Sequence, residues 1–236
     1  AQATLLRHIA TIVVLDLSDC QLTDITPLAQ LHYLTALTLS NNNISDITPL
    51  AQLAHLSYLV LDGNCIDDVA PLAALTNLMV LGLGFNNISD ISPLAALNRL
   101  IRLDLYYNQI TDITPLAHLS QLAFLYLGFD ERCGEFYGTS DASWVLSPNQ
   151  ITDISPLANL TQLDELYLTE IGVRDISPLT NLINLTTLGL QYNTLEDVLV
   201  LAALPQLRWL DLTGSVVEPS QRAKLEQALP LCDIQG

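Results

Sequence analysis

The residues best suited to metal binding or nucleophilic catalysis are few and widely separated in this sequence. No two histidines have the spacing of a metal-ligand pair, and no cysteine belongs to a metal-binding or catalytic motif. Asp104 and Asp211, two candidate acids, lie four repeat units apart in the pattern described below, too far for a paired acid–base reaction. We therefore expect no enzyme activity, no metal site and no cofactor. The histidines and cysteines are His8, His32, His55, His118, Cys20, Cys65, Cys133 and Cys232.

The chemistry that the chain does concentrate is that of recognition. It has 14 aromatic residues, and 25 acidic residues against eight lysines and arginines, which gives a net charge of −17. Aromatic rings offer a large and rigid contact area, and acidic side chains attract basic partners. The scarcity of lysine and arginine argues against binding nucleic acid or an anionic membrane, because both need positive charge.

Nearly all of these aromatic residues occupy the variable positions of a 22-residue repeat, whereas about a third of the acidic residues fill one of its fixed positions. The unit reads L-x-x-L-x-L-x-x-N-x-I-x-D-I-x-P-L-x-x-L-x-x, and its fixed period predicts a leucine-rich repeat solenoid. A ninth, divergent copy begins at Leu207, and the copy from Leu122 is interrupted by 19 residues, 130–148. The full copies begin at Ile12, Leu34, Leu56, Leu78, Leu100, Leu122, Leu163 and Leu185.

The repeat predicts the path of each coil. The segment L-x-x-L-x-L alternates as a strand does, so stacked coils should form a parallel β-sheet with one strand per coil on the concave side. The convex side should return through short turns or 3₁₀ segments, and residues 219–229 should form a capping helix. We thus expect an α/β solenoid, a horseshoe of one elongated domain. Its parts are a partial repeat at 1–11, eight repeats at 12–206, and a divergent last repeat with a cap at 207–236.

Two polar positions of the repeat have predicted structural roles. The asparagine, for example Asn64, should bond backbone groups of its own coil and of the neighbouring coil. The aspartate, for example Asp46, should accept backbone N–H bonds at the start of the convex turn. The core should be aliphatic, since no aromatic residue occupies an inward position of a coil. We expect all four cysteines to be free thiols, which suits a reducing compartment and a disulfide-free surface protein alike.

With these residues in view, the unit N-x-I-x-D-I-x-P-L resembles the bacterial internalin-type leucine-rich repeat over about residues 5–218. The resemblance implies a curved solenoid that binds a protein ligand on its concave sheet, and favours a bacterial surface or secreted protein. The chain departs from the pattern at the insertion, at Ile171 in place of the asparagine and at Val200 in place of the proline. Residues 1–11 lack the layout of a signal peptide and read as the end of a preceding repeat. The longest apolar run, 198–204, is too short to cross a bilayer.

The third, fifth, seventh and eighth positions of each coil should form the concave face. Ten of the 14 aromatic residues lie there, and three more lie in the insertion. Because no aromatic residue is expected in the core, we interpret this as an exposed row of rings that binds a ligand. The predicted ligand-binding residues are Tyr58, Phe85, Arg102, Asp104, Tyr106, Tyr107, Phe124, Tyr126, Phe129, Phe136, Tyr137, Trp144, Glu165, Tyr167, Tyr192, Trp209 and Asp211.

The insertion leaves the repeat at the edge of this face. Apolar residues on either side of Gly138 suggest a hairpin that walls the binding site, whereas the plainer alternative is a tolerated surface loop. The leading hypothesis is a non-enzymatic module, expected to be a monomer, that binds a protein or peptide with a basic contact patch. It can be an internalin-type adhesin or a diversified or engineered binder on that scaffold. The alternative is a structural solenoid that assembles with copies of itself through the same face.

Overall fold

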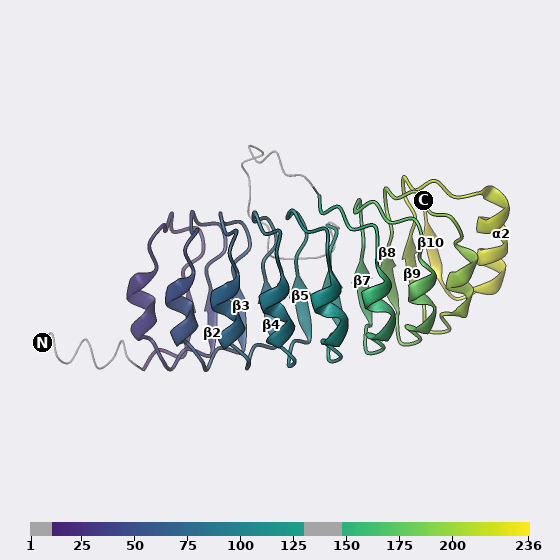
Figure 1. Ribbon diagram of the computed structural model, residues 1–236. Helices are drawn as coiled ribbons and strands as arrows, with labels where there is room; N and C mark the ends of the chain where they lie inside the picture. Colours follow the sequence, from purple (N-terminus) through teal and green to yellow (C-terminus); the bar gives the residue numbers. More distant parts are fainter. Residues whose placement is uncertain (1–10, 130–147) are drawn as a thin grey trace, which may run out of the picture.

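The computed structural model describes residues 11–129 and 148–236, and shows a row of stacked coils (Figure 1). Strands line one side of the row and short helices line the other. Within the described residues the strands form one parallel sheet of ten, in sequence order. The predicted leucine-rich repeat solenoid is therefore confirmed.

Every strand is three residues long and pairs in register with the next coil, so equivalent repeat positions stand in columns. The strands are β1 (Val14–Asp16), β2 (Ala36–Thr38), β3 (Tyr58–Val60), β4 (Val80–Gly82), β5 (Arg102–Asp104), β6 (Phe124–Tyr126), β7 (Glu165–Tyr167), β8 (Thr187–Gly189), β9 (Trp209–Asp211) and β10 (Asp233–Gln235). We call the outward side chains of this sheet, with the two residues after each coil's second inward leucine, the concave face.

The convex side consists of five-residue 3₁₀ helices, as predicted. The aspartate of the repeat accepts a backbone N–H bond two residues later, at 2.8 or 2.9 Å in each of its eight copies. The predicted hydrogen bond at the start of the convex turn is thus confirmed. The helices are η1 (Thr26–Gln30), η2 (Thr48–Gln52), η3 (Ala70–Ala74), η4 (Ser92–Ala96), η5 (Thr114–His118), η7 (Ser155–Asn159), η8 (Ser177–Asn181) and η9 (Leu199–Ala203).

Between the sheet and the 3₁₀ helices lies a core of leucine, isoleucine and valine in the described residues. The asparagine of the repeat joins its coils from within. Asn64 donates through Nδ2 to the carbonyls of Leu39 and Leu61, and its Oδ1 accepts the N–H of Ile44 at 3.1 Å. The same arrangement recurs at Asn42, Asn86, Asn108, Asn149 and Asn193. These side chains satisfy backbone groups that would otherwise be buried without partners.

At the seventh coil the asparagine is replaced by Ile171, and a backbone bond takes over part of its role. The N–H of Ile151 donates directly to the carbonyl of Ile171 at 2.8 Å. The next residue, Gly172, has a φ of +87°, a conformation that glycine adopts without steric cost. The chain thus passes this position by a different local backbone route.

The C-terminal end contains the expected helix and one strand that the repeat pattern did not predict. Helix α2 (Pro219–Ala228) buries Leu225 and packs against η9. The chain then returns to the sheet and adds β10 beside β9. Cys20, Cys65 and Cys232 are free thiols, as expected. Cys133 and the partial repeat at residues 1–10 lie outside the described residues.

Candidate functional site

The strand register brings most of the predicted binding residues together on the concave face. The third repeat position forms a column through Tyr58, Val80, Arg102, Phe124 and Glu165, and on to Trp209. The fifth position places Asp104, Tyr126 and Tyr167 side by side. Phe136, Tyr137, Trp144 and the proposed hairpin lie outside the described residues, so their placement stays a prediction.

Eight of the predicted aromatic residues form a second cluster, separate from the aliphatic core. Tyr106, Tyr126 and Tyr167 are its centre, with relative exposures of 0%, 3% and 4%. Phe85, Tyr107, Phe124, Phe129 and Trp209 pack around them and are half-buried. The expectation of an exposed row of rings is therefore wrong for the three central tyrosines. Each ring lies against its neighbours instead of standing in solvent.

Glycines in neighbouring coils explain why these rings can lie flat. A Cβ atom at Gly84 would meet the Tyr106 ring at 2.2 Å, and one at Gly189 would meet the Tyr167 ring at 2.7 Å. The missing side chains thus leave room for the ring of the adjacent coil. Tyr126 and Tyr167 stack with ring centroids 5.1 Å apart, and Trp209 lies 6.0 Å from Tyr167.

The edge of the face carries aromatic residues in an unusual backbone conformation. The eighth position is left-handed in every described coil except coil 6, and Phe85, Tyr107 and Tyr192 adopt this conformation with φ of 54°, 49° and 56°. Other coils place Asn41 or Gly63 there, which suit this region far better than a bulky ring. Phe85 and Tyr107 stack at 4.9 Å, and Phe129 lies 5.5 Å from Tyr107. Tyr192 is 61% exposed.

Arg102 links the aromatic cluster to the acids of the face. Its guanidinium forms an ion pair with Asp104 at 3.1 Å and lies 4.7 Å from the centre of the Tyr126 ring. The Tyr126 hydroxyl in turn donates to Glu165 Oε2 at 2.9 Å. Burial is the main cause that raises the pKa of Tyr126, so the hydroxyl stays a donor.

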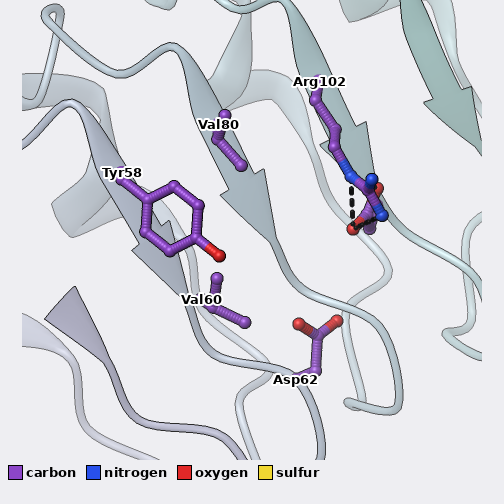
Figure 2. A pocket seen from close by; sticks show the side chains of 6 residues that line it. Tyr58, Val60, Asp62, Val80 and Arg102 are labelled. Carbon is purple, nitrogen blue, oxygen red and sulfur yellow. Dashed lines mark hydrogen bonds and ion pairs between the residues drawn. The ribbon is translucent and has the colours of Figure 1, made fainter. Parts of the chain in front are cut away.

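Beside Arg102 the face is hollowed into a pocket of about 120 Å³. Figure 2 shows the Asp62 carboxylate directed toward the space between Val60 and Arg102. We call this hollow the coil 4 pocket, because Val80 of the fourth coil lines it and two other lining side chains, Val60 and Asp62, lie over Gly82 of that coil. It is lined by Tyr58, Val60, Asp62, Val80, Arg102 and Asp104.

Asp62 is a buried acid whose two carboxylate oxygens have different surroundings. Its Oδ1 accepts the N–H of Gly84 at 2.6 Å and the hydroxyl of Tyr106 at 3.0 Å. Its Oδ2 lies over Gly82, where a Cβ atom would approach it to 2.3 Å. Burial, followed by repulsion from Asp104, raises the pKa of Asp62 to about 8. Burial also raises the pKa of Asp104, to about 6, against the opposing effect of Arg102.

Asp62 was not among the predicted binding residues, and neither were Val60 and Val80. A signal for the pocket exists in the sequence, because the repeat alignment places Gly82 and Gly84 between coils with large side chains. At the far end of the face Asp211 is buried in a polar chain. Thr169 donates to Gln191 at 2.7 Å, and Gln191 donates to Asp211 at 3.2 Å.

In residues 11–129 and 148–236, no group of three or more histidine, cysteine, aspartate or glutamate side chains could hold a metal ion. None of the helices in that part of the chain has the length and apolarity needed to span a membrane.

Family models and solved structures place the chain among known proteins. Leucine-rich repeat models match residues 11–52, as two copies of the repeat, and residues 76–131. No curated protein sequence matches. The structure of the Arabidopsis receptor kinase HAESA, in complex with a peptide hormone and a co-receptor, shares 21% identity over 87% of this chain and 33% of that one, with a TM-score of 0.64. At that identity the likeness shows the fold alone.

Two internalins of Listeria monocytogenes are more similar in sequence. Internalin C2 is 35% identical over 86% of this chain and 81% of that chain, with a TM-score of 0.75. The internalin InlF is 30% identical over 91% and 71% of the two chains, with a TM-score of 0.56. Both share the sheet of parallel strands described above, and the identity extends over most of each chain. The chain therefore belongs to the internalin family of leucine-rich repeat proteins.

Proposed function

We propose that the concave face is a non-enzymatic recognition surface that binds a protein or peptide ligand with a basic contact patch. The observation that carries the proposal is the strained aromatic edge. Phe85, Tyr107 and Tyr192 stand at left-handed positions where asparagine or glycine is easier to accommodate. Strain of this kind persists where the side chain has a use, and large rings are the usual anchors of protein interfaces.

The layout of the aromatic cluster supports this proposal. The buried Tyr106, Tyr126 and Tyr167 form a rigid floor, while Phe85, Tyr107 and Phe129 are half-buried and stacked above the edge of the sheet. Side chains that are already fixed lose little entropy when a ligand binds. We therefore assign the contact energy to the half-buried rings, and a supporting role to the buried ones.

The charges of the face favour a basic ligand. Its acidic residues are opposed by one basic residue on the face, Arg102, among the described residues, and that guanidinium is paired with Asp104. A surface of one sign raises the encounter rate with oppositely charged partners. The acids of the face are Asp16, Asp19, Asp62, Asp104, Glu165, Glu170 and Asp211.

A peptide-display selection against the intact protein tests this proposal. The selected peptides are then measured against a variant with Phe85→Asn and Tyr107→Asn, and against the matched control Tyr33→Ala, which removes an exposed ring outside the concave face. We expect peptides rich in lysine and arginine whose affinity falls at least about tenfold in the double variant, as for hot-spot residues. Peptides that bind the double variant and the intact protein equally would place the site elsewhere.

A further inference from the structure

The coil 4 pocket has the composition of a site for a single cationic group. Two buried carboxylates, Asp62 and Asp104, face it together with one guanidinium, that of Arg102. The guanidinium makes three contacts of 3.1 to 3.2 Å with Asp104, so Asp104 is compensated locally. Asp62 has no such cation in the pocket.

The orientation of Asp62 directs one oxygen to the pocket. Its Oδ1 is held by Gly84 and Tyr106, while Oδ2 has no hydrogen-bond partner among the described residues and lies over the bare backbone of Gly82. Among the described residues the one fully enclosed side-chain atom without a partner is Ser40 Oγ, so Asp62 Oδ2 is open to the pocket and accessible to a group that enters it.

The remaining walls suit the stem of a lysine side chain. Tyr58, Val60 and Val80 are apolar over most of their surface and line the approach to the acids (Figure 2). A volume of about 120 Å³ equals roughly four water molecules, enough for an ammonium group and the methylenes next to it. An ammonium is also compact, and its aliphatic stem packs well on apolar walls.

We propose that the coil 4 pocket binds the ammonium group of a lysine side chain, with Asp62 Oδ2 as its acceptor and Tyr58, Val60 and Val80 around its stem. This inference rests on the proposed function, and names the kind of residue by which a basic ligand is anchored. It sets the pocket apart from the aromatic edge, which supplies contact area and not charge recognition.

The ionisation of Asp62 gives the proposal a specific pH dependence. The groups facing Asp62 are Asp104, Arg102, Tyr106 and Tyr58. Burial, followed by repulsion from Asp104, raises the pKa of Asp62 to about 8, against the opposing effects of the Gly84 N–H and of Arg102. In the free protein at neutral pH Asp62 is therefore mostly protonated. An ammonium ligand favours the carboxylate, so binding releases a proton and strengthens as pH rises toward 8. A neutral ligand that accepts a hydrogen bond from protonated Asp62 has the opposite dependence.

Two small probes test the pocket without any macromolecular ligand. N-acetyl-lysine N-methylamide and its neutral analogue N-acetyl-norleucine N-methylamide are titrated into the intact protein while the amide NMR signals of Gly82 and Gly84 are followed. We expect binding of the lysine probe only. Its dissociation constant should fall about tenfold per pH unit from pH 6.5 to 8 and level off above, as displacement of one proton requires.

Matched variants locate the effect. Asp62→Asn removes the charge but keeps an acceptor for Gly84 and Tyr106, and should weaken lysine-probe binding at least about tenfold and abolish its pH dependence. Asp67→Asn removes one negative charge at an exposed position outside the concave face and should leave binding unchanged. Val80→Phe fills the pocket while both acids stay in the sequence. It provides the same test of the pocket if the Asp62→Asn protein does not fold.

Three results would overturn the proposal: equal binding of the norleucine probe, affinity that falls as pH rises, or full binding by both Asp62→Asn and Val80→Phe. The outcome is independent of the display selection. If the probes fail while selected peptides still depend on the aromatic edge, the concave face keeps its proposed function and the lysine pocket is wrong. If the probes bind but no peptide does, the lysine pocket stands and the proposed function of the concave face is wrong.

Discussion

The hydroxyl of Tyr106 donates to Asp62 Oδ1 at 3.0 Å, although the two residues are 44 positions and two coils apart. The ring reaches across the intervening coil by lying over Gly84. This contact connects the aromatic cluster to the coil 4 pocket. Tyr106 belongs to the buried centre of the cluster, and its hydroxyl also fixes Asp62, the acid of the pocket. The concave face is thus one connected structure and not a set of independent side chains.

Removal of that hydroxyl should lower stability. Tyr106→Phe keeps the ring but leaves the buried Asp62 with one hydrogen bond fewer, at a cost of about 1–3 kcal/mol in the free energy of unfolding. An exposed ring, which the sequence predicts here, would contribute little to stability, but Tyr106 is fully buried. Urea unfolding measures the change, with Tyr192→Phe, an exposed tyrosine, as the control. Equal midpoints for both variants would mean that the Tyr106–Asp62 bond contributes nothing.

Stability should decrease as pH rises from about 4 to 8. The folded pKa values of Asp62 and Asp104, about 8 and about 6, lie above the ordinary value of 3.8. The folded state therefore holds protons that the unfolded state has released, and a raised pKa stabilises the fold only at low pH. One such proton changes the free energy of unfolding by about 1.4 kcal/mol per pH unit. Asp62→Asn should flatten this slope in chemical denaturation at several pH values.

The convex aspartates should change the stability of the fold at lower pH than the buried acids do. Hydrogen bonds from the residue two positions later lower the pKa of Asp24, Asp46, Asp90, Asp112, Asp153 and Asp175 below 3.8. The stability they contribute is complete above that value and is lost as pH falls through their folded pKa values. Together the two groups predict maximum stability at about pH 4 to 5. A maximum at pH 7 or above would show that the buried acids of the concave face have ordinary pKa values.

Replacing the strained rings should separate stability from binding. Tyr192→Asn removes an exposed ring from a left-handed position, where bulky residues cost about 1–2 kcal/mol, so its melting temperature should stay the same or rise. Phe85→Asn and Tyr107→Asn lose stacking worth about 0.5–1.5 kcal/mol and gain similar relief, so they should change stability little. All three should weaken ligand binding. Calorimetry that shows large losses of stability would assign these rings to the fold.

Deleting residues 130–148 should leave the solenoid folded. Asn149, directly after the insertion, already bonds the carbonyls of Leu105 and Leu127 as the other ladder asparagines do. Removing a closed loop of 19 residues gains about 2–3 kcal/mol of chain entropy, which offsets the left-handed conformation that Phe129 would need to adopt. Ligand binding should weaken, because the insertion carries Phe136, Tyr137 and Trp144. Affinity equal to that of the intact protein would make the insertion a spacer.

Salt should slow association with a basic ligand. The acids of the concave face attract such a ligand over distances that shrink to about 8 Å at physiological ionic strength. With a display-selected basic peptide, surface-plasmon kinetics should show an association rate that falls as salt rises, and a dissociation rate that changes much less. An association rate independent of salt would leave the acids with a role in solubility only.

The framework was predictable because each of its features repeats. The inward leucines, the asparagine ladder and the capping aspartates occupy fixed positions, so one coil predicts the rest. β10 was missed because Asp233–Gln235 has none of the leucine pattern and joins the sheet only by following α2 back to β9. The single-copy end of the chain offers no such redundancy.

The concave face was predicted as a surface but not in its packing. The repeat shows which side chains point outward, yet their burial depends on what the adjacent coils leave vacant. Tyr106 is buried because Gly84 precedes it by one coil, and Asp62 is held because Tyr106 follows it by two. Reading the columns across coils, and not each coil alone, is the step that would have found both.

The replacement of the ladder asparagine by Ile171 has a mechanical consequence. Elsewhere from coil 1 to coil 8 of the described residues, an asparagine side chain bonds each coil to the one before it. Between coils 6 and 7 no asparagine does so, and the connection is made by backbone bonds, core packing and the contacts of Tyr126 with Glu165 and Tyr167 on the concave face. A solenoid pulled from its ends loads these junctions in series. Under tension the chain should part first at this junction, and each coil released would lengthen it by about 70–80 Å.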